Sequence, residues 1–293
     1  MRTGVCCTLF FLLSSEVESP FEAGGGGPAR VVSVFCENTK QEKKQRKTSN
    51  LILFIYFVKI IIKTMTIVIT GGSRGIGREL INYFSQKKRV KIIALSSNSE
   101  NLSNLAKKKN IHVIDVDFAI EDTIYEATEI IRTITSEVTI LINNAAILIN
   151  KSFEKISSKE LEKIYRINLF SPYIFTQQLV PLMGKKEKSH VVNISSMGGF
   201  QGSSKFSGLS AYTSSKGALT ILSECLAEEL KEKNISVNCL CLGSVNTEML
   251  KKAFPGYKAT TSAKQMANFI GNFALNGHLT FNGKVLPVSA STP

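Results

Sequence analysis

Between Met65 and Val288 the sequence alternates between short apolar, β-branched stretches and longer amphipathic stretches of helical period. The short stretches are mainly apolar and do not alternate strictly with polar residues, as in strands that are buried on both faces. Parallel strands need crossover helices, and these come to cover both faces of the sheet. The pattern predicts one doubly wound α/β domain at residues 65–293, built on a seven-stranded parallel sheet. Strands are expected at 66–70, 90–96, 111–116, 139–143, 190–195, 236–242 and 284–288, and helices at 75–86, 123–135, 157–183 and 211–233.

Residues 1–64 differ in character from the rest of the chain. Residues 1–13 carry a weak secretory-signal pattern, and the apolar run 51–62 contains Lys59 and is shorter than the roughly 20 residues that a bilayer span requires. The first expected strand begins directly after Met65. We therefore expect residues 1–64 to be an extension that is unstructured or not part of the working protein, with a membrane anchor or a targeting peptide as the alternatives.

The formal net charge of +13 raises the question of a nucleic-acid or membrane partner. The lysines, however, lie in separate short runs without interleaved aromatic residues, and the chain has no Trp. We interpret these lysine runs as parts of solvent-exposed surfaces and expect no nucleic-acid partner. The six cysteines form no CxxC pair and have no neighbouring His cluster, so no metal site is expected. A reduced, cytoplasmic setting fits this cysteine usage best.

A glycine-rich turn joins the first expected strand to the first expected helix. It runs Thr70-Gly71-Gly72-Ser73-Arg74-Gly75-Ile76-Gly77. Glycines permit a tight turn and let backbone N–H groups approach a pyrophosphate, and the helix N-terminus that follows favours negative charge. The spacing is G-x-x-x-G-x-G, longer than the usual dinucleotide fingerprint. Its position between strand and helix predicts a dinucleotide site.

The end of the second expected strand indicates which nicotinamide cofactor binds. An acidic residue there binds the ribose hydroxyl of NAD, whereas a basic residue nearby accommodates the 2′-phosphate of NADP. The strand ends in Ser96 and Ser97 without a carboxylate, and Arg74 offers a guanidinium suited to phosphate. Both features favour NADP(H) over NAD(H), and a merely solvated Arg74 is the alternative.

Further motifs follow in a fixed order along the chain. They are Asn143-Asn144-Ala145-Ala146, Asn168, Ser195-Ser196 and Tyr212-Thr213-Ser214-Ser215-Lys216. Together with the glycine turn, this series closely resembles the short-chain dehydrogenase/reductase family over nearly the whole of residues 65–288. The resemblance implies a Rossmann-type fold and an enzyme that interconverts a carbonyl and a secondary alcohol by hydride transfer.

The resemblance also assigns roles to four residues. Tyr212 is the expected general acid/base, and Lys216, one helical turn later, is expected to lower the pKa of its phenol and to bind the nicotinamide ribose. Ser196 is expected to hold the substrate oxygen; strand alternation lets only one serine of the pair face the cleft, and the family pattern favours the second over Ser195. Asn168 is expected to anchor a water that links Lys216 to solvent.

Other positions match the family's cofactor contacts. Asp117 corresponds to the aspartate that meets the adenine, with Asp115 as the competing candidate. The full set of expected cofactor-binding residues is Thr70, Gly71, Ser73, Arg74, Gly75, Ile76, Gly77, Ser96, Ser97, Asp117, Asn144, Ala145, Tyr212, Lys216, Gly243 and Thr247.

Three features depart from the family pattern or vary within it. Ala146 replaces a glycine that is commoner after Asn-Asn-Ala, and Leu242 replaces a proline usual before Gly243. The stretch between Ser196 and Tyr212 is about three residues longer than in many relatives and includes Lys205 and Phe206.

Residues 247–271 are expected to form the substrate lid. Its apolar residues indicate a partly hydrophobic substrate or, equally, helix packing; they are Met249, Leu250, Phe254, Pro255, Tyr257 and Met266.

The sequence thus predicts an NADP(H)-dependent oxidoreductase for a small-molecule carbonyl or alcohol. A 3-oxoacyl thioester, a small ketone or diketone, a pterin-like ketone and a sugar are the candidate substrates. A homodimer or homotetramer is expected from the resemblance alone. The alternatives are a cofactor-binding regulatory protein without catalysis and a membrane-anchored reductase of a lipid-like substrate.

Overall fold

The computed structural model describes Ser49 and residues 64–290, so the expectations for the N-terminal extension lie almost wholly outside the described residues. Among the residues that the structure describes, no helix combines the length and the apolar character needed to cross a membrane. The elements are β1 (Met65–Thr70), α2 (Gly75–Ser85), β2 (Val90–Ser96), α3 (Ser103–Ala106), β3 (Ile111–Asp115), α4 (Glu121–Ile134), β4 (Ile140–Asn143), α5 (Ser158–Tyr165), α6 (Ser171–Leu179), β5 (Ser189–Ser196), α7 (Ser210–Glu229), β6 (Ile235–Leu242), β7 (Val245–Asn246), α8 (Glu248–Ala253), β8 (Thr261–Ser262), α9 (Ala263–Asn276) and β9 (Val285–Val288).

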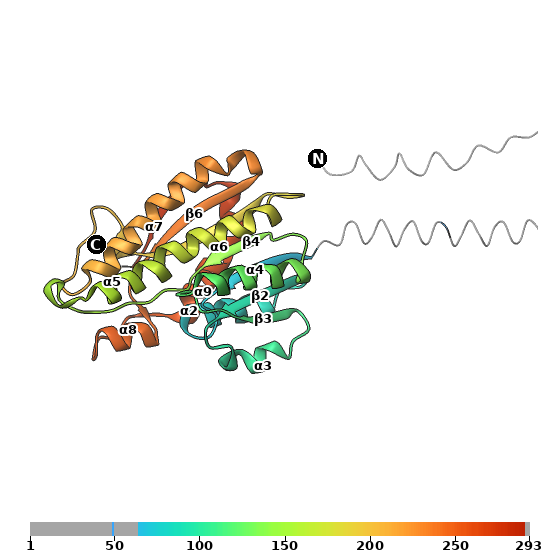
Figure 1. Ribbon diagram of the computed structural model, residues 1–293. Coiled ribbons are helices and arrows are strands. Elements are labelled where there is room, and N and C mark those ends of the chain that lie inside the picture. Colours follow the sequence, from blue (N-terminus) through green and yellow to red (C-terminus); the bar gives the residue numbers. More distant parts are fainter. Residues whose placement is uncertain (1–48, 50–63, 291–293) are drawn as a thin grey trace, which may run out of the picture. The chain divides into compact units, whose positions relative to one another are not determined.

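The seven expected strands form one sheet in the order β3-β2-β1-β4-β5-β6-β9, and every neighbouring pair is parallel. Helices lie on both faces, with α4, α6 and α7 over one face and α2 and α9 over the other (Figure 1). The doubly wound, Rossmann-type prediction is confirmed. The strand order reverses between β1 and β4, and a ligand crevice forms at such a switch point in open α/β sheets.

Alternation along β1 shows how the apolar strands supply two cores. Ile67 and Ile69 pack on one face with Phe84 of α2 and Ile270 of α9, whereas Val68 faces α4 and α6 on the other. All five side chains are fully buried. Because both faces are covered, each strand needs apolar residues at successive positions, which accounts for the uninterrupted apolar runs.

The helix expected at 157–183 is not continuous. A π-helical turn, Arg166–Phe170, separates α5 from α6. Its member Asn168 is fully buried and turns its amide toward Ile147 and Ser215, in neighbouring segments. A widened turn of this kind re-aims one side chain, and such turns are frequent at functional sites.

Candidate active site

A cavity of about 570 Å³ opens where the carboxyl ends of β1, β2, β5 and β6 meet. Its volume lies within the roughly 300–1,000 Å³ typical of small-molecule sites. Residues from segments far apart in the chain share its wall. The expected site residues that line the cavity are Gly71, Ser73, Arg74, Gly75, Ile76, Ser96, Ser97, Asp117, Asn144, Ala145, Ser196, Tyr212, Lys216, Gly243 and Thr247.

Three expected site residues, Thr70, Gly77 and Asn168, lie behind this wall. The Thr70 hydroxyl accepts hydrogen bonds from the backbone N–H groups of Asn144 and Ala145, each at 3.0 Å. A Cβ on Gly77 would lie 2.1 Å from the carbonyl oxygen of Gly71. These two residues therefore fix the glycine turn against the loop after β4, and they act on the cavity through their neighbours.

The glycine turn has the geometry of an anion cradle. Gly71 and Gly75 have φ of 71° and 54°, where a side chain would be strained. A Cβ on Gly71 would also lie 2.8 Å from the Cα of Ala145. No side chain caps the N-terminus of α2, and its first turn holds no acidic residue. The N–H groups of this helix end are thus left for a ligand, and the turn fits the pyrophosphate of a dinucleotide.

The two serines at the end of β5 have different environments. Ser195 is buried, and its hydroxyl donates to the carbonyl oxygen of Lys216 at 2.9 Å. Both serines line the cavity, but the Ser196 hydroxyl accepts a hydrogen bond from Gly198 N–H at 3.3 Å and lowers the pKa of the Tyr212 phenol. The Ser196 hydroxyl therefore acts on Tyr212, whereas the Ser195 hydroxyl is taken up by the Lys216 carbonyl oxygen.

The acid–base state of Tyr212 differs from the sequence-based expectation. Burial raises the pKa of Tyr212 to about 12, and the Ser196 hydroxyl lowers it only in part. The Lys216 ammonium, which is expected to lower this pKa, donates to the carbonyl oxygen of Ile194 at 2.8 Å. Burial likewise lowers the pKa of Lys216 to about 8. At neutral pH the phenol keeps its proton and can donate it.

Asn168 is held by three hydrogen bonds. Its Oδ1 accepts from Ile147 N–H at 2.9 Å, and its Nδ2 donates to the Ile147 carbonyl oxygen and to the Ser215 hydroxyl, each at 3.0 Å. Ile147 lines the cavity, and Ser215 precedes Lys216 in α7. The residue thus ties α7 to the loop after β4; its role in anchoring a water stays a prediction.

Charged groups at the glycine turn include one that the sequence did not reveal. Arg74 lies 3.8 Å from the carboxylate of Glu248, the first residue of α8, and both side chains are largely exposed. Glu248 lines the cavity, yet nothing in the sequence places it near residue 74 before the chain is folded.

Of the two aspartates expected to compete for the adenine contact, Asp117 lines the cavity. Asp115 lies outside it and accepts a hydrogen bond from the Ser99 hydroxyl.

Five of the six expected lid residues lie in the cavity wall or the core, and Pro255 is exposed outside the cavity. Met249, Leu250, Phe254 and Tyr257 line the cavity, together with Phe206 from the longer loop before α7. Met266 instead packs in the core on α9, so the packing interpretation holds for that residue. The two residues that depart from the family pattern, Ala146 and Leu242, also line the cavity. Phe118 and Leu148 line it as well, although no sequence motif points to them.

Two segments that flank the cavity are fastened to the same short stretch, Asn150 and Lys151. Asn150 Nδ2 donates to the carbonyl oxygen of Ala253 at 2.8 Å, where α8 ends. Lys151 N–H donates to the carbonyl oxygen of Gly208 at 2.9 Å, in the loop before α7. The positions of α8 and of the loop before α7 therefore both depend on this stretch.

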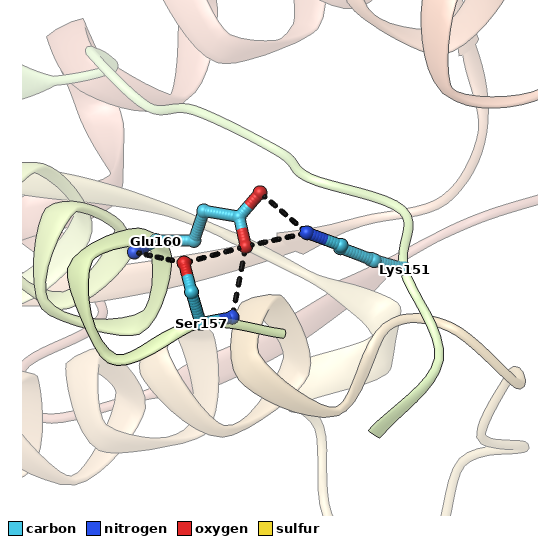
Figure 2. A network of polar contacts seen from close by, with 3 residues as sticks. All are labelled: Lys151, Ser157 and Glu160. Atoms are coloured by element: carbon cyan, nitrogen blue, oxygen red, sulfur yellow. Dashed lines mark hydrogen bonds and ion pairs between the residues drawn. The ribbon is translucent and has the colours of Figure 1, made fainter. Parts of the chain in front are cut away.

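A polar network anchors that stretch to the start of α5. Figure 2 shows the Lys151 ammonium on both carboxylate oxygens of Glu160, at 3.0 and 2.8 Å, while the N–H and hydroxyl of Ser157 hydrogen-bond the same carboxylate. Ser157 and Glu160 form a reciprocal capping box. The hydrogen bond from Lys151, followed by those from Ser157, lowers the pKa of Glu160 to about 2. The network is thus charged throughout the neutral range.

Comparison with known proteins supplies the family. A family model described as short chain dehydrogenase matches residues 65–258, more than half of the chain. The chain belongs to this family. Short-chain dehydrogenases are oxidoreductases that act on CH–OH and C=O groups with a nicotinamide cofactor, and the protein is an enzyme of this kind.

Relatives of this short-chain dehydrogenase include two groups of enzymes. The 3-oxoacyl-[acyl-carrier-protein] reductase FabG of Aquifex aeolicus is 30% identical over 187 residues, which cover 62% of this chain and 74% of the relative. Estradiol 17-beta-dehydrogenase 11 of Homo sapiens is 29% identical over 227 residues, covering 72% of this chain and 74% of the relative.

Solved structures share the fold and carry both nicotinamide cofactors. The 3-ketoacyl-(acyl-carrier-protein) reductase from Brucella melitensis complexed with NADH aligns with a TM-score of 0.71 and 20% identity over 78% of this chain and 97% of that chain. The RhlG/NADP active-site complex of Pseudomonas aeruginosa aligns with a TM-score of 0.68 and 23% identity over 78% of this chain and 96% of that chain. These two likenesses establish the fold, and they do not separate NAD from NADP.

Proposed function

We propose that the protein is an NADP(H)-dependent oxidoreductase that interconverts a carbonyl and a secondary alcohol, with Tyr212 as general acid/base. One observation carries the proposal: the phenol of Tyr212 and the hydroxyl of Ser196, which lowers the pKa of that phenol, line the same cavity as the glycine turn. A proton donor, an oxygen-binding hydroxyl and a dinucleotide cradle thereby share one cavity. This is the set of parts that carbonyl reduction needs.

The nicotinamide, when bound, supplies or accepts the hydride. The glycine turn and the N-terminus of α2 hold its pyrophosphate, and Ser96, Ser97 and Asp117 border the adenosine end. Ser196 donates a hydrogen bond to the substrate oxygen and orients the carbonyl. Tyr212 delivers its proton to the same oxygen as the carbonyl carbon is reduced, and it takes the proton back in alcohol oxidation.

Two further residues support this exchange in the proposal. Lys216 binds the nicotinamide ribose, for which its ammonium would leave or share the carbonyl oxygen of Ile194. Asn168 positions α7 through Ser215 and anchors the water that returns a proton toward Lys216. The buried amide of Asn168 and its place in the π-helical turn support a positioning role.

The preference for NADP(H) rests on charge at the adenosine end. Ser96 and Ser97 bring no carboxylate to the end of β2, and Arg74 reaches the cavity from the glycine turn. The ion pair of Arg74 with Glu248 joins two exposed side chains, and such pairs contribute about 0–1 kcal/mol. The guanidinium is therefore available to bind a 2′-phosphate through two parallel hydrogen bonds, a bidentate arrangement.

Replacing Arg74 by alanine tests this preference. We expect Arg74→Ala to raise the KM for NADPH by about ten- to hundredfold, because a charge-assisted hydrogen bond contributes roughly 1.5–3 kcal/mol. The KM for NADH should change less than about twofold. Arg78→Ala is the matched control, since Arg78 donates to the Asn101 carbonyl oxygen and does not line the cavity. Equal losses for both cofactors would contradict the assignment.

A spectroscopic assay tests the activity itself. The purified chain is mixed with NADPH or NADH and a carbonyl panel that includes a 3-oxoacyl thioester, small ketones and a steroid ketone, and cofactor absorbance is followed. We expect oxidation of NADPH with at least one of these carbonyls. Cofactor binding without turnover on any of them would favour the non-catalytic alternative.

Mass spectrometry of the native N-terminus tests the membrane-anchored alternative. The cytoplasmic location and the homodimer or homotetramer stay predictions.

Asn150 offers a test of how the cavity wall is held. Asn150→Asp keeps the shape of the side chain but removes the donor to the carbonyl oxygen of Ala253. We expect the KM for the carbonyl substrate to rise about two- to tenfold with kcat little changed, because one hydrogen bond contributes roughly 0.5–1.5 kcal/mol. Asn276→Asp is the control, since Asn276 also donates to a backbone carbonyl, that of Asn272, away from the cavity. An unchanged KM in Asn150→Asp would show that the α8 contact does not shape the site.

A further inference from the structure

The charged side chains of the cavity are confined to part of its wall. Among the described residues that line it, the charged ones are Arg74, Asp117, Lys216 and Glu248. Arg74 and Glu248 pair with each other at the glycine turn, Asp117 follows β3, and the Lys216 ammonium is bound to a backbone carbonyl. None of these charges comes from Met197 and Gly198, which directly follow Ser196, from the loop before Tyr212, or from the chain beyond Glu248.

Those three segments supply a wall of apolar side chains. Met197 directly follows Ser196, and Phe206 and Leu209 lie in the loop that leads to Tyr212. Met249 and Phe254 belong to α8 or directly follow it, and all five line the cavity. An apolar surface therefore borders the two hydroxyl groups that are proposed to hold the substrate oxygen.

Most polar groups on this side of the cavity already have partners within the protein. The Ser195 hydroxyl donates to the Lys216 carbonyl oxygen, and the Ser244 hydroxyl lies 3.1 Å from the Tyr257 phenol oxygen. Ser196 and Tyr212 thus remain to bind one substrate oxygen. A sugar or a pterin carries several donors and acceptors, and leaving these unpaired in an apolar site costs roughly 1–3 kcal/mol of binding each, or about five- to hundredfold in affinity.

The apolar wall is also partly open to solvent where a substrate would enter. Phe206 and Tyr257 are 62% and 53% exposed although both line the cavity. A bound apolar group would cover this surface and gain the corresponding hydrophobic free energy. Because α8 and the loop before α7 are fastened to Asn150 and Lys151, the wall exists before a substrate arrives.

From this arrangement we infer that the substrate is an uncharged ketone, or the matching alcohol, with an apolar chain or ring system attached to the reacting carbon. Phe206 is a specificity-determining residue that contacts this apolar group. The inference rests on the proposed function and narrows its substrate class. A linear aliphatic chain and a fused alicyclic ring share the required chemistry, and the test separates them.

Binding of a homologous series measures the inference without requiring turnover. Dissociation constants of 2-alkanones from butanone to 2-decanone, and of 2-decalone as the ring, are measured by calorimetry on the full chain and its Tyr212→Phe variant, with and without NADPH. We expect affinity to rise about fourfold for each added methylene until the wall is covered, as roughly 0.8 kcal/mol per buried CH₂ requires. Whichever of 2-decanone and 2-decalone binds more tightly identifies the shape.

A charged analogue and two phenylalanine variants sharpen the result. 5-Oxohexanoate has as many non-hydrogen atoms as 2-octanone and should bind at least about tenfold more weakly. Phe206→Ser should weaken 2-decanone about tenfold and leave butanone unchanged. Phe153→Ser is the control, because Phe153 is also exposed but does not line the cavity, and it should change neither.

Two outcomes would overturn the inference: affinities that do not depend on chain length, or 5-oxohexanoate binding as tightly as 2-octanone. Either result is read from binding alone. Failure of the proposed function would appear separately, as tight binding of apolar ketones with no oxidation of NADPH or with undiminished turnover in Tyr212→Phe.

Discussion

Replacing Tyr212 by phenylalanine lowers kcat for carbonyl reduction by about 10³-fold, because general acid–base catalysis contributes roughly 10²–10⁴-fold. The variant removes the phenolic hydroxyl and leaves the buried ring in place. The fold and the glycine turn should therefore be unaffected, and the dissociation constant for NADPH should stay within about twofold of the parent. Steady-state turnover and calorimetry of NADPH binding measure the two effects separately.

A second tyrosine provides the control for this result. Tyr173 on α6 is half exposed and does not line the cavity, so Tyr173→Phe should keep the parent's kcat. If Tyr212→Phe kept more than about a tenth of the parent's kcat, the phenol could not be the proton donor. Another group would then have to supply the proton.

Replacing Lys216 by methionine is expected to separate stability from activity. Burial lowers the pKa of Lys216 from 10.5 to about 8, which corresponds to a cost on the order of 3 kcal/mol for keeping the ammonium in the folded state. Methionine removes that cost but leaves the carbonyl oxygen of Ile194 without its donor, which costs about 1–2 kcal/mol. We expect the variant to be about 1–2 kcal/mol more stable at pH 7, while turnover falls at least about 10²-fold.

The pH dependence of this difference has a definite sign. Below pH 8 both the folded and the unfolded parent carry the charged ammonium, and the full burial cost applies. Between pH 8 and 10.5 the folded state binds fewer protons than the unfolded state, so the stability of the parent rises with pH. The advantage of Lys216→Met should therefore shrink as pH rises from 8 to 10.5. Chemical denaturation at pH 7 and pH 10 checks this, and an advantage that grows with pH would contradict it.

Much of the fold could be predicted from the sequence because both faces of the sheet are covered. Double-sided burial forces continuous apolar runs such as Ile92–Leu95, and each of the seven expected strands lies within one residue of its observed bounds. The short strands β7 and β8 carry no such signal, since each has two residues and pairs only with the other. The sequence pattern does not predict them, although β7 directly precedes the lid segment and β8 directly precedes α9.

The parts of the site that sequence could not supply depend on three-dimensional neighbours. Spacing of four residues indicates that Tyr212 and Lys216 share a helix face, but it does not show that the ammonium turns to the Ile194 carbonyl. Burial then outweighs the Ser196 hydroxyl in setting the pKa of Tyr212. Similarly, Glu248 reaches Arg74 only because α8 folds back toward the glycine turn. Local motifs predict which side chains gather, and tertiary packing decides their protonation and partners.

Hydride transfer itself can be followed directly. The purified chain reduces an accepted ketone with NADPH that carries deuterium at C4 of the nicotinamide, prepared separately in each stereochemical form, and the alcohol product is analysed by mass spectrometry and NMR. With one of the two forms, we expect one deuterium on the carbinol carbon of each product molecule. Replacement of Tyr212 by phenylalanine should reduce the rate of its appearance about 10³-fold. A product without deuterium from either form, or label that appears as fast in Tyr212→Phe as in the parent, would contradict hydride transfer with Tyr212 as its proton donor.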